Sequence, residues 1–230
     1  STAERLNIAT NALSRITTRY SDGPTKMSYN ALYLQQTKQL DAHWVLNDGI
    51  RFNLVQLDAR FADTTLMHFP FNRAIQNNTA VTGNLGIAYN GENGYRATAG
   101  LSSGFRSPNV DDLTKVFDTK TGYVVVPNKD LKPEYTYNAE INLSHTGNIA
   151  SWGASVFYTW FNNAIVVSKY NWNGQDNIMY QNVLSTVYAP QNQASAKLYG
   201  FNLNGKIKLF YNTLLQGTYT YTKGTYNNGT

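Results

Sequence analysis

The sequence lacks cysteine, has few charges and contains no long apolar run. The absence of cysteine among its 230 residues excludes disulfides, zinc ribbons and thiol chemistry. Charged residues make up 14% of the chain, against about 25% in an ordinary soluble domain. No stretch approaches the roughly 18 unbroken apolar residues that a membrane-spanning helix needs. Strong helix formers are also scarce, which disfavours a helical bundle.

Tyrosine, asparagine, threonine, serine and glycine take the place of the missing charges, with 17 tyrosines and 17 glycines. An aromatic content of 13% disfavours intrinsic disorder, and tyrosine and threonine favour strands. The formal net charge of +5 raises the question of nucleic-acid binding. The basic residues are dispersed along the chain, however, so we expect no nucleic-acid partner.

Apolar and polar residues alternate along eight segments. Between residues 134 and 145, for example, the odd-numbered positions from Tyr135 to Leu143 carry Tyr, Ala, Ile and Leu, while the even-numbered ones are polar. Such alternation predicts strands with one apolar and one polar face. In one segment the apolar positions change phase near Val55, which predicts a β-bulge. The expected strands are 31–40, 50–61, 79–89, 95–105, 134–145, 151–161, 197–209 and 213–222.

The connections between these segments alternate between short and long. A soluble sandwich does not predict this alternation, whereas an outer-membrane barrel has short periplasmic turns and long external loops. Tyrosine and tryptophan also gather at the strand ends, where a barrel has its aromatic girdles. We therefore expect an all-β fold, an antiparallel up-and-down transmembrane β-barrel fragment whose apolar face meets lipid. The long connections are 62–78, 106–133 and 162–196.

No pattern supports an enzyme, a cofactor or a metal site. The segment 100–104 fits the G-x-S-x-G nucleophile motif, but Ser102 lies inside an expected strand and no helix follows. The histidines lack metal-site spacing, and the aspartates of the second long connection lack a calcium-loop frame. These residues are His43, His68 and His145, and Asp111, Asp112, Asp118 and Asp130.

Two segments resemble the barrel of the TonB-dependent outer-membrane receptors. In that family an F-R-A-P segment ends one strand, and an N-P-x-L-K-P-E segment opens the next strand after an external loop. Here the first segment has Ser107 in place of alanine, and the second reads P-N-K-D-L-K-P-E from Pro127. The residues that carry the resemblance are Gly104, Phe105, Arg106, Pro108, Asn109, Asn128, Leu131, Pro133 and Glu134.

The two segments also have a physical interpretation. Pro108 ends strand pairing because proline has no N–H to donate, and Pro133 keeps Lys132 extended. Arg106 is expected on the lumen side of the wall. The connection between the two segments would then be tethered at both ends and able to fold over a ligand.

The resemblance implies an active-transport receptor in the outer membrane of a Gram-negative bacterium, similar to those of Bacteroidetes. Its partners would be outer-membrane lipid, the TonB complex through a plug domain, and a small nutrient ligand. Residues 1–230 would form eight strands of a barrel of about 22, as an open sheet. The plug, the first half of the barrel and the final strands would lie outside the sequence.

The nutrient is left open among iron–siderophore, haem, cobalamin and similar molecules. Haem receptors of the family carry a loop histidine between the two segments, and none occurs between Phe105 and Leu131. Two alternative functions also stay open, a non-transporting barrel such as a porin, and a secreted or surface glycan-binding module that uses Trp152, Trp160 and Trp172. For the transport function, ligand contacts in loops and lumen are expected at Arg96, Arg106, Asp111, Asp112, Lys206 and Lys208.

Overall fold

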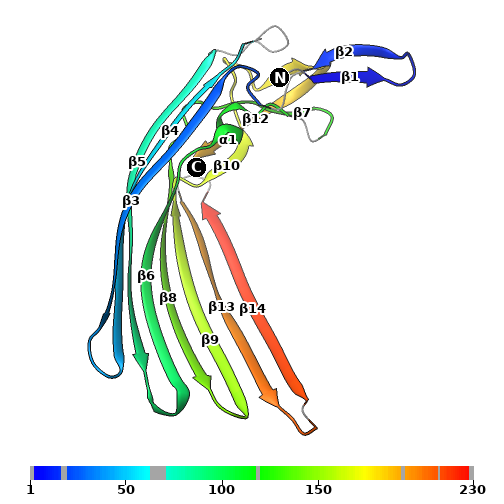
Figure 1. The fold of residues 1–230 in the computed structure, drawn as a ribbon. Helices are drawn as coiled ribbons and strands as arrows, with labels where there is room; N and C mark the ends of the chain where they lie inside the picture. Colours follow the sequence, from blue (N-terminus) through cyan, green and yellow to red (C-terminus); the bar gives the residue numbers. More distant parts are fainter. Residues whose placement is uncertain are drawn as a thin grey trace.

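The computed structural model describes residues 3–16, 20–62, 71–117, 120–192, 195–211 and 213–227. Its largest feature is an eight-stranded antiparallel sheet that forms a tall curved wall (Figure 1). Within the described residues the sheet is open, because its outermost strands, β3 and β14, do not pair. In order along the wall the strands are β3 (Thr25–Gln39), β4 (Trp44–Arg60), β5 (Arg73–Asn90), β6 (Tyr95–Arg106), β8 (Glu134–Thr146), β9 (Ala150–Asn162), β13 (Ser195–Lys208) and β14 (Leu214–Asn227).

These strands confirm all eight segments expected from the sequence. Short turns at 40–43, 91–94, 147–149 and 209–213 join the strands at one end of the wall, the lower end in Figure 1. The turn at 91–94 contains the short 3-10 helix Glu92–Gly94. Gly94 has a φ of +79°, and a Cβ there would come within 2.1 Å of the Thr146 carbonyl oxygen. The described parts of the long connections lie at the opposite end, as the alternation predicted.

The registers place alternate side chains consistently on two faces across the wall. The outer face carries apolar residues that are strongly exposed, such as Leu101, Ile141 and Val156. Amides and hydroxyls on the inner face bond to one another across strands, for example Asn142 Nδ2 to Thr98 Oγ1 at 3.1 Å. Ser102 lies within β6, so the G-x-S-x-G segment is part of the sheet, as expected.

Aromatic rings gather near both ends of the outer face. Beside the short turns, the ring centroids of Tyr95 and His145 lie 4.5 Å apart. Near the other end, the centroids of Phe105 and Tyr135 lie 5.6 Å apart. The eleven residues from Tyr95 to Phe105 extend about 33 Å along the strand, or about 25 Å in height at a typical barrel tilt. That height matches the apolar band of outer-membrane barrels.

The bulge expected near Val55 is wrong. β4 pairs without interruption with β3 and with β5, so its side chains keep one phase throughout. Ile50 and Phe52 are exposed on the outer face, whereas Val55, Leu57 and Ala59 are buried on the inner face. The apolar residues of β4 move from the outer to the inner face because the strand leaves the membrane band and there packs against the loops on its inner side.

The described parts of the second and third long connections are folded rather than irregular. Four short strands, β7 (Tyr123–Val125), β10 (Ile165–Lys169), β11 (Asn177–Tyr180) and β12 (Val183–Asn192), form a second sheet. β7 pairs in parallel with β12, which joins two connections that are distant in sequence. We call this sheet, together with α1 (Val110–Thr114) and the connecting segments 126–133 and 170–176, the loop cap. A separate hairpin of β1 (Ala3–Asn7) and β2 (Ala12–Ile16) occupies part of the region expected to precede the first strand.

Two buried clusters hold the loop cap together and fix it to the wall. The first contains Val124, Val187 and Trp172 within the cap. The second packs Leu113 and Leu131 of the cap against inner-face residues of β4 and β5, including Leu57. Phe71 contacts both clusters. The cap therefore lies over the inner side of the wall. In the described part of the chain, no helix is long and apolar enough to cross a membrane.

The lipid-facing assignment of the outer face can be tested with Ile141→Arg in the full-length receptor folded into lipid vesicles. We expect a cost of about 2–4 kcal/mol, because Ile141 lies near the middle of β8 and its replacement would put a charge at the bilayer midplane. The matched change on the inner face, Asn142→Arg, should stay within about 0.5 kcal/mol. Urea unfolding followed by heat-modifiable gel mobility measures both, and equal costs would contradict the assignment.

Candidate functional site

The two family-like segments meet at the loop end of the wall. Arg106, the last residue of β6, pairs directly with Glu134, the first residue of β8. Both lie on the inner face of the wall, the polar side on which the sequence places Arg106. Pro108 follows the end of β6 and Pro133 precedes β8, also as expected. The two ends of the connection 107–133 are therefore held side by side.

A helix cap organises the start of this connection. The Asn109 side chain accepts a hydrogen bond from Asp112 N at 3.0 Å, and Asp112 Oδ2 accepts one from Asn109 N at 3.0 Å. This reciprocal pair is a capping box, which satisfies two backbone donors at the start of α1. The sequence analysis missed it, although an asparagine followed three residues later by an acid is a capping signal.

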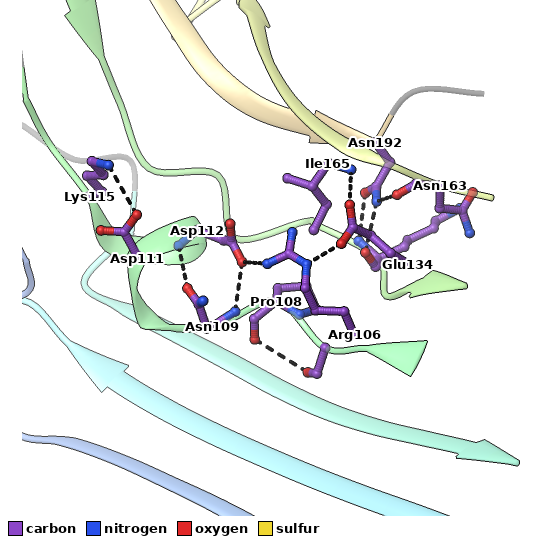
Figure 2. Close-up of polar contacts among 12 residues, drawn as sticks. Arg106, Pro108, Asn109, Asp111, Asp112, Lys115, Glu134, Asn163, Ile165 and Asn192 are labelled. Carbon is purple, nitrogen blue, oxygen red and sulfur yellow. Dashed lines mark hydrogen bonds and ion pairs between the residues drawn. The ribbon is translucent and has the colours of Figure 1, made fainter. Parts of the chain in front are cut away.

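Arg106 connects this cap to the second long connection (Figure 2). Its Nη1 donates to Asp112 Oδ2 at 2.7 Å, and its Nε donates to Glu134. The other oxygen of Glu134 accepts a hydrogen bond from the backbone N–H of Ile165, at the start of β10. One guanidinium thus joins two carboxylates, and each carboxylate holds the backbone of a different connection.

The charge on Arg106 is stable in this position. Partial burial disfavours the charged guanidinium, but the hydrogen bond to Glu134 and the charge of Asp112 outweigh that effect and raise the pKa of Arg106. The side chain is 44% exposed, so water still screens the two ion pairs. The guanidinium therefore remains a permanent cation between two acids.

Asn192 fastens the remaining ends of the two connections. Its Oδ1 accepts from Lys132 N at 2.7 Å, and its Nδ2 donates to the carbonyl oxygens of Lys132 at 2.8 Å and Asn163 at 2.7 Å. The Asn192 side-chain amide therefore forms hydrogen bonds with the backbone of both connections, as a neighbouring strand would. We call Arg106, Asp112, Glu134 and Asn192 the clasp. Asn192 carried no signal in the sequence, because its partners are backbone groups about 30 and 60 residues away.

Further polar contacts attach the family-like segments to the wall. Gln76 Nε2 of β5 donates to the carbonyl oxygens of Lys129 and Leu131 at 2.9 and 3.1 Å. Asn78 Nδ2 donates to Ser107 Oγ at 2.9 Å. Asn128 Nδ2 donates to the Pro190 carbonyl oxygen of β12 at 2.9 Å. These segments therefore hold the cap on the wall, in addition to any contact with a ligand.

The six residues expected to contact ligand fall into two separate sets. Arg106 and Asp112 belong to the clasp, and Asp111 forms an ion pair with Lys115 at 3.1 Å. The other three lie on the inner face at the opposite end of the wall, near the short turns. These three are Arg96, Lys206 and Lys208. Within the described residues no group of histidines and acids could hold a metal, while His68 and Asp118 lie outside the described residues.

The arrangement of strands, turns and loop cap can be compared with known proteins. The family described as TonB dependent receptor-like, beta-barrel matches residues 2–230. The chain belongs to this family. The expectation drawn from the two motif segments is therefore confirmed. The related proteins are transport receptors rather than enzymes, which also agrees with the sequence analysis.

One curated relative and two solved structures illustrate the match. "Hemoglobin and hemoglobin-haptoglobin-binding protein A" of Haemophilus influenzae is 31% identical over 148 residues, which are 59% of this chain and 13% of that protein. The copper transporter OprC aligns with a TM-score of 0.73 at 16% identity, covering 97% of this chain and 34% of that chain. The Serratia marcescens hemophore receptor HasR, solved as a double mutant with its hemophore HasA and heme, gives 0.70 at 14%, covering 92% and 36%.

The low identity and partial coverage limit what these matches show. At such low identity, the two structures show a shared fold alone. The TonB-dependent receptor chain described here spans about a third of the length of both, and 13% of the curated relative.

The role of Asn192 predicts a strong effect from an isosteric change. Asn192→Asp replaces an N–H donor by a carboxylate oxygen that faces the carbonyls of Lys132 and Asn163. We expect a loss of about 1–3 kcal/mol in local stability, because two acceptors lose their donor. Limited proteolysis of the full-length receptor between residues 163 and 192 should therefore accelerate. Asn148→Asp, in the β8–β9 turn, serves as a matched control, and equal cleavage rates in the two variants would exclude the role.

Removing the guanidinium tests the other half of the clasp. Arg106→Ala leaves Asp112 and Glu134 without their shared cation. Charged hydrogen bonds contribute about 1.5–3 kcal/mol, and partial exposure reduces this to about 1–2 kcal/mol here. Hydrogen exchange of the α1 amides should accelerate about tenfold in the full-length receptor, while the amides of β13 should not change. Unchanged exchange at α1 would show that the capping box holds the helix alone.

Proposed function

We propose that this chain is part of an outer-membrane receptor that takes up a scarce nutrient with energy supplied through TonB. The observation that carries the proposal is the loop cap, which is folded and fastened over the inner side of a membrane-type wall. Buried Leu113 and Leu131 and the clasp hold the cap there. A cap in this position would control access from the outside to the polar inner face.

The completed receptor would contain more of the barrel than the wall described here. We propose that residues 1–230 are one part of a barrel of about 22 strands, with a plug domain inside it. The exposed outer face supports contact with outer-membrane lipid. The unpaired edges of β3 and β14 offer backbone groups to which further strands can pair.

We propose that the transported nutrient is an iron-containing compound, either haem or a ferric siderophore. The curated relative is named for binding hemoglobin, and the aligned HasR structure contains a hemophore and heme. Both names support haem iron ahead of cobalamin. Residues 107–130 contain no histidine, so an iron ligand would have to come from another segment. A ferric siderophore therefore stays as the second candidate.

The alternative of a tryptophan-based glycan-binding module has less support. Trp152 and Trp160 lie on the outer face, at the two ends of β9 near the aromatic bands. Trp172 is buried in the core of the loop cap. None of the three is therefore placed as a sugar platform at the loop end.

Uptake can be tested by expressing the full-length receptor in a Gram-negative host that lacks its own haem receptors and siderophores. The host is grown under iron limitation with hemoglobin, free haem or a ferric siderophore as the iron source. We expect growth on at least one source, and only in cells with functional TonB. Growth that is independent of TonB would favour a porin, and growth on none of the sources would refute iron uptake.

A further inference from the structure

A hollow in the loop cap lies between β10 and β11, at the point where these two strands pair one after the other with the same edge of β12. Thr186 pairs with both β7 and β11, while Tyr188 pairs with both β7 and β10. β7 therefore lies along one edge of β12, and β10 and β11 share the other edge, one after the other. Between β10 and β11 the chain leaves the sheet at residues 170–176 and then returns.

Backbone hydrogen bonds attach both ends of segment 170–176 to Val187 of β12. Tyr170 N donates to the Val187 carbonyl oxygen at 3.0 Å, and Val187 N donates to the Asp176 carbonyl oxygen at 2.9 Å. A second pair of bonds joins Trp172 and Gln175 across the excursion, at 2.8 and 2.9 Å. Because Trp172 is buried in the cap core, the excursion is a fixed part of the fold.

The hollow has the size of a small-molecule site, and most of the residues that line it have a polar group on the side chain. Its volume is ≈ 600 Å³, within the range of about 300–1,000 Å³ typical of ligand pockets. The lining contains one lysine and one aspartate, so its formal charges cancel, which is compatible with a neutral ligand. Around Val187 the lining side chains are Lys169, Tyr170, Asn171, Asp176, Asn177 and Thr186.

Hydrogen bonds between these side chains orient them in advance. Asn171 Nδ2 donates to Asp176 Oδ1 at 2.9 Å, and Thr186 Oγ1 donates to Asn177 Oδ1 at 2.9 Å. Each amide group has two N–H donors, and each carboxylate has two oxygens, so each pair keeps both donors and acceptors for a ligand. Paired donors and acceptors at fixed positions match the hydroxyl groups of a sugar, each of which can both donate and accept.

Two tyrosines stand beside the hollow on the same face of the sheet. The rings of Tyr123 and Tyr188 stack with centroids 4.2 Å apart and an interplanar angle of 26°. Tyr188 pairs with Lys169 at the rim of the hollow. Burial, and then the neighbouring Tyr188, raise the pKa of Tyr123 above its ordinary value. These rings supply an apolar surface next to the polar groups.

We propose that this hollow binds a neutral, hydroxyl-rich ligand, namely a glycan. The amides, Asp176 and Thr186 would bind the hydroxyl edge of a sugar ring, and Tyr188 would contact its C–H face. The site lies in the loop cap, beyond the outer aromatic band, so it would be open to water and to glycans outside the cell. The inference goes beyond nutrient transport and does not depend on it.

The experiment uses the full-length receptor in detergent and a panel of immobilised neutral hexasaccharides with glucose, galactose or mannose ends, beside a sialylated one. We expect binding to at least one neutral glycan. Asn177→Ala should weaken that binding about tenfold, which corresponds to about 1.4 kcal/mol. Tyr188→Ala should weaken it further, whereas Tyr188→Phe should retain most of it because the ring remains.

Asn148→Ala, in the β8–β9 turn at the opposite end of the wall, is the matched control and should bind as the unaltered receptor does. Heat-modifiable mobility confirms that each variant is folded. Failure of all neutral hexasaccharides to bind, or equal binding by Asn177→Ala and Asn148→Ala, would overturn the proposal. Iron-dependent growth with the Asn177→Ala receptor reports separately on transport, so each proposal can fail without the other.

Discussion

One sheet has to separate two different solvents, and the rest of the structure depends on this constraint. Lipid offers no hydrogen bonds to the backbone, so strands have to pair with their neighbours where they cross the membrane. β4 does so along its length with both β3 and β5. Unbroken pairing keeps every second side chain on the same face. The outer face is therefore mainly apolar through the membrane band, with Asp48 of β4 as an exception, and the inner face carries amides and hydroxyls.

The same unbroken pairing creates the place where the loop cap docks. Above the aromatic band the outer face no longer meets lipid, and the inner face of β4 is free to become apolar. Leu57 and Ala59 occupy it, and the cap residues Leu113 and Leu131 pack against them. Hydrophobic burial stabilises the docked loop cap, but it does little to fix the orientation of the cap on the wall, because it is non-directional. The clasp fixes this orientation, because Arg106 and Asn192 form hydrogen bonds at the ends of the second and third long connections.

The expected ligand residues show where sequence reasoning stops. The sequence predicts ligand contacts for Arg106, on the lumen side of a strand end, and for Asp112, in the following loop, and the structure places the two in one ion pair that holds this loop. Lys206 and Lys208 were correctly expected on the polar face, yet they lie at the far end of the wall from the cap. A position on a face follows from period-two alternation, whereas a neighbour from another part of the chain does not.

The sequence alone determined the eight strands, their two faces, the alternation of turns and loops, and the family resemblance. Each of these depends on local pattern, because alternation, proline and turn residues act on adjacent positions. Only the tertiary structure decided that the long connections form a second sheet, that the phase change near Val55 is not a bulge, and that Asn192 closes the clasp. These features depend on pairing between segments far apart in sequence, such as β7 with β12, for which a single sequence carries no local signal.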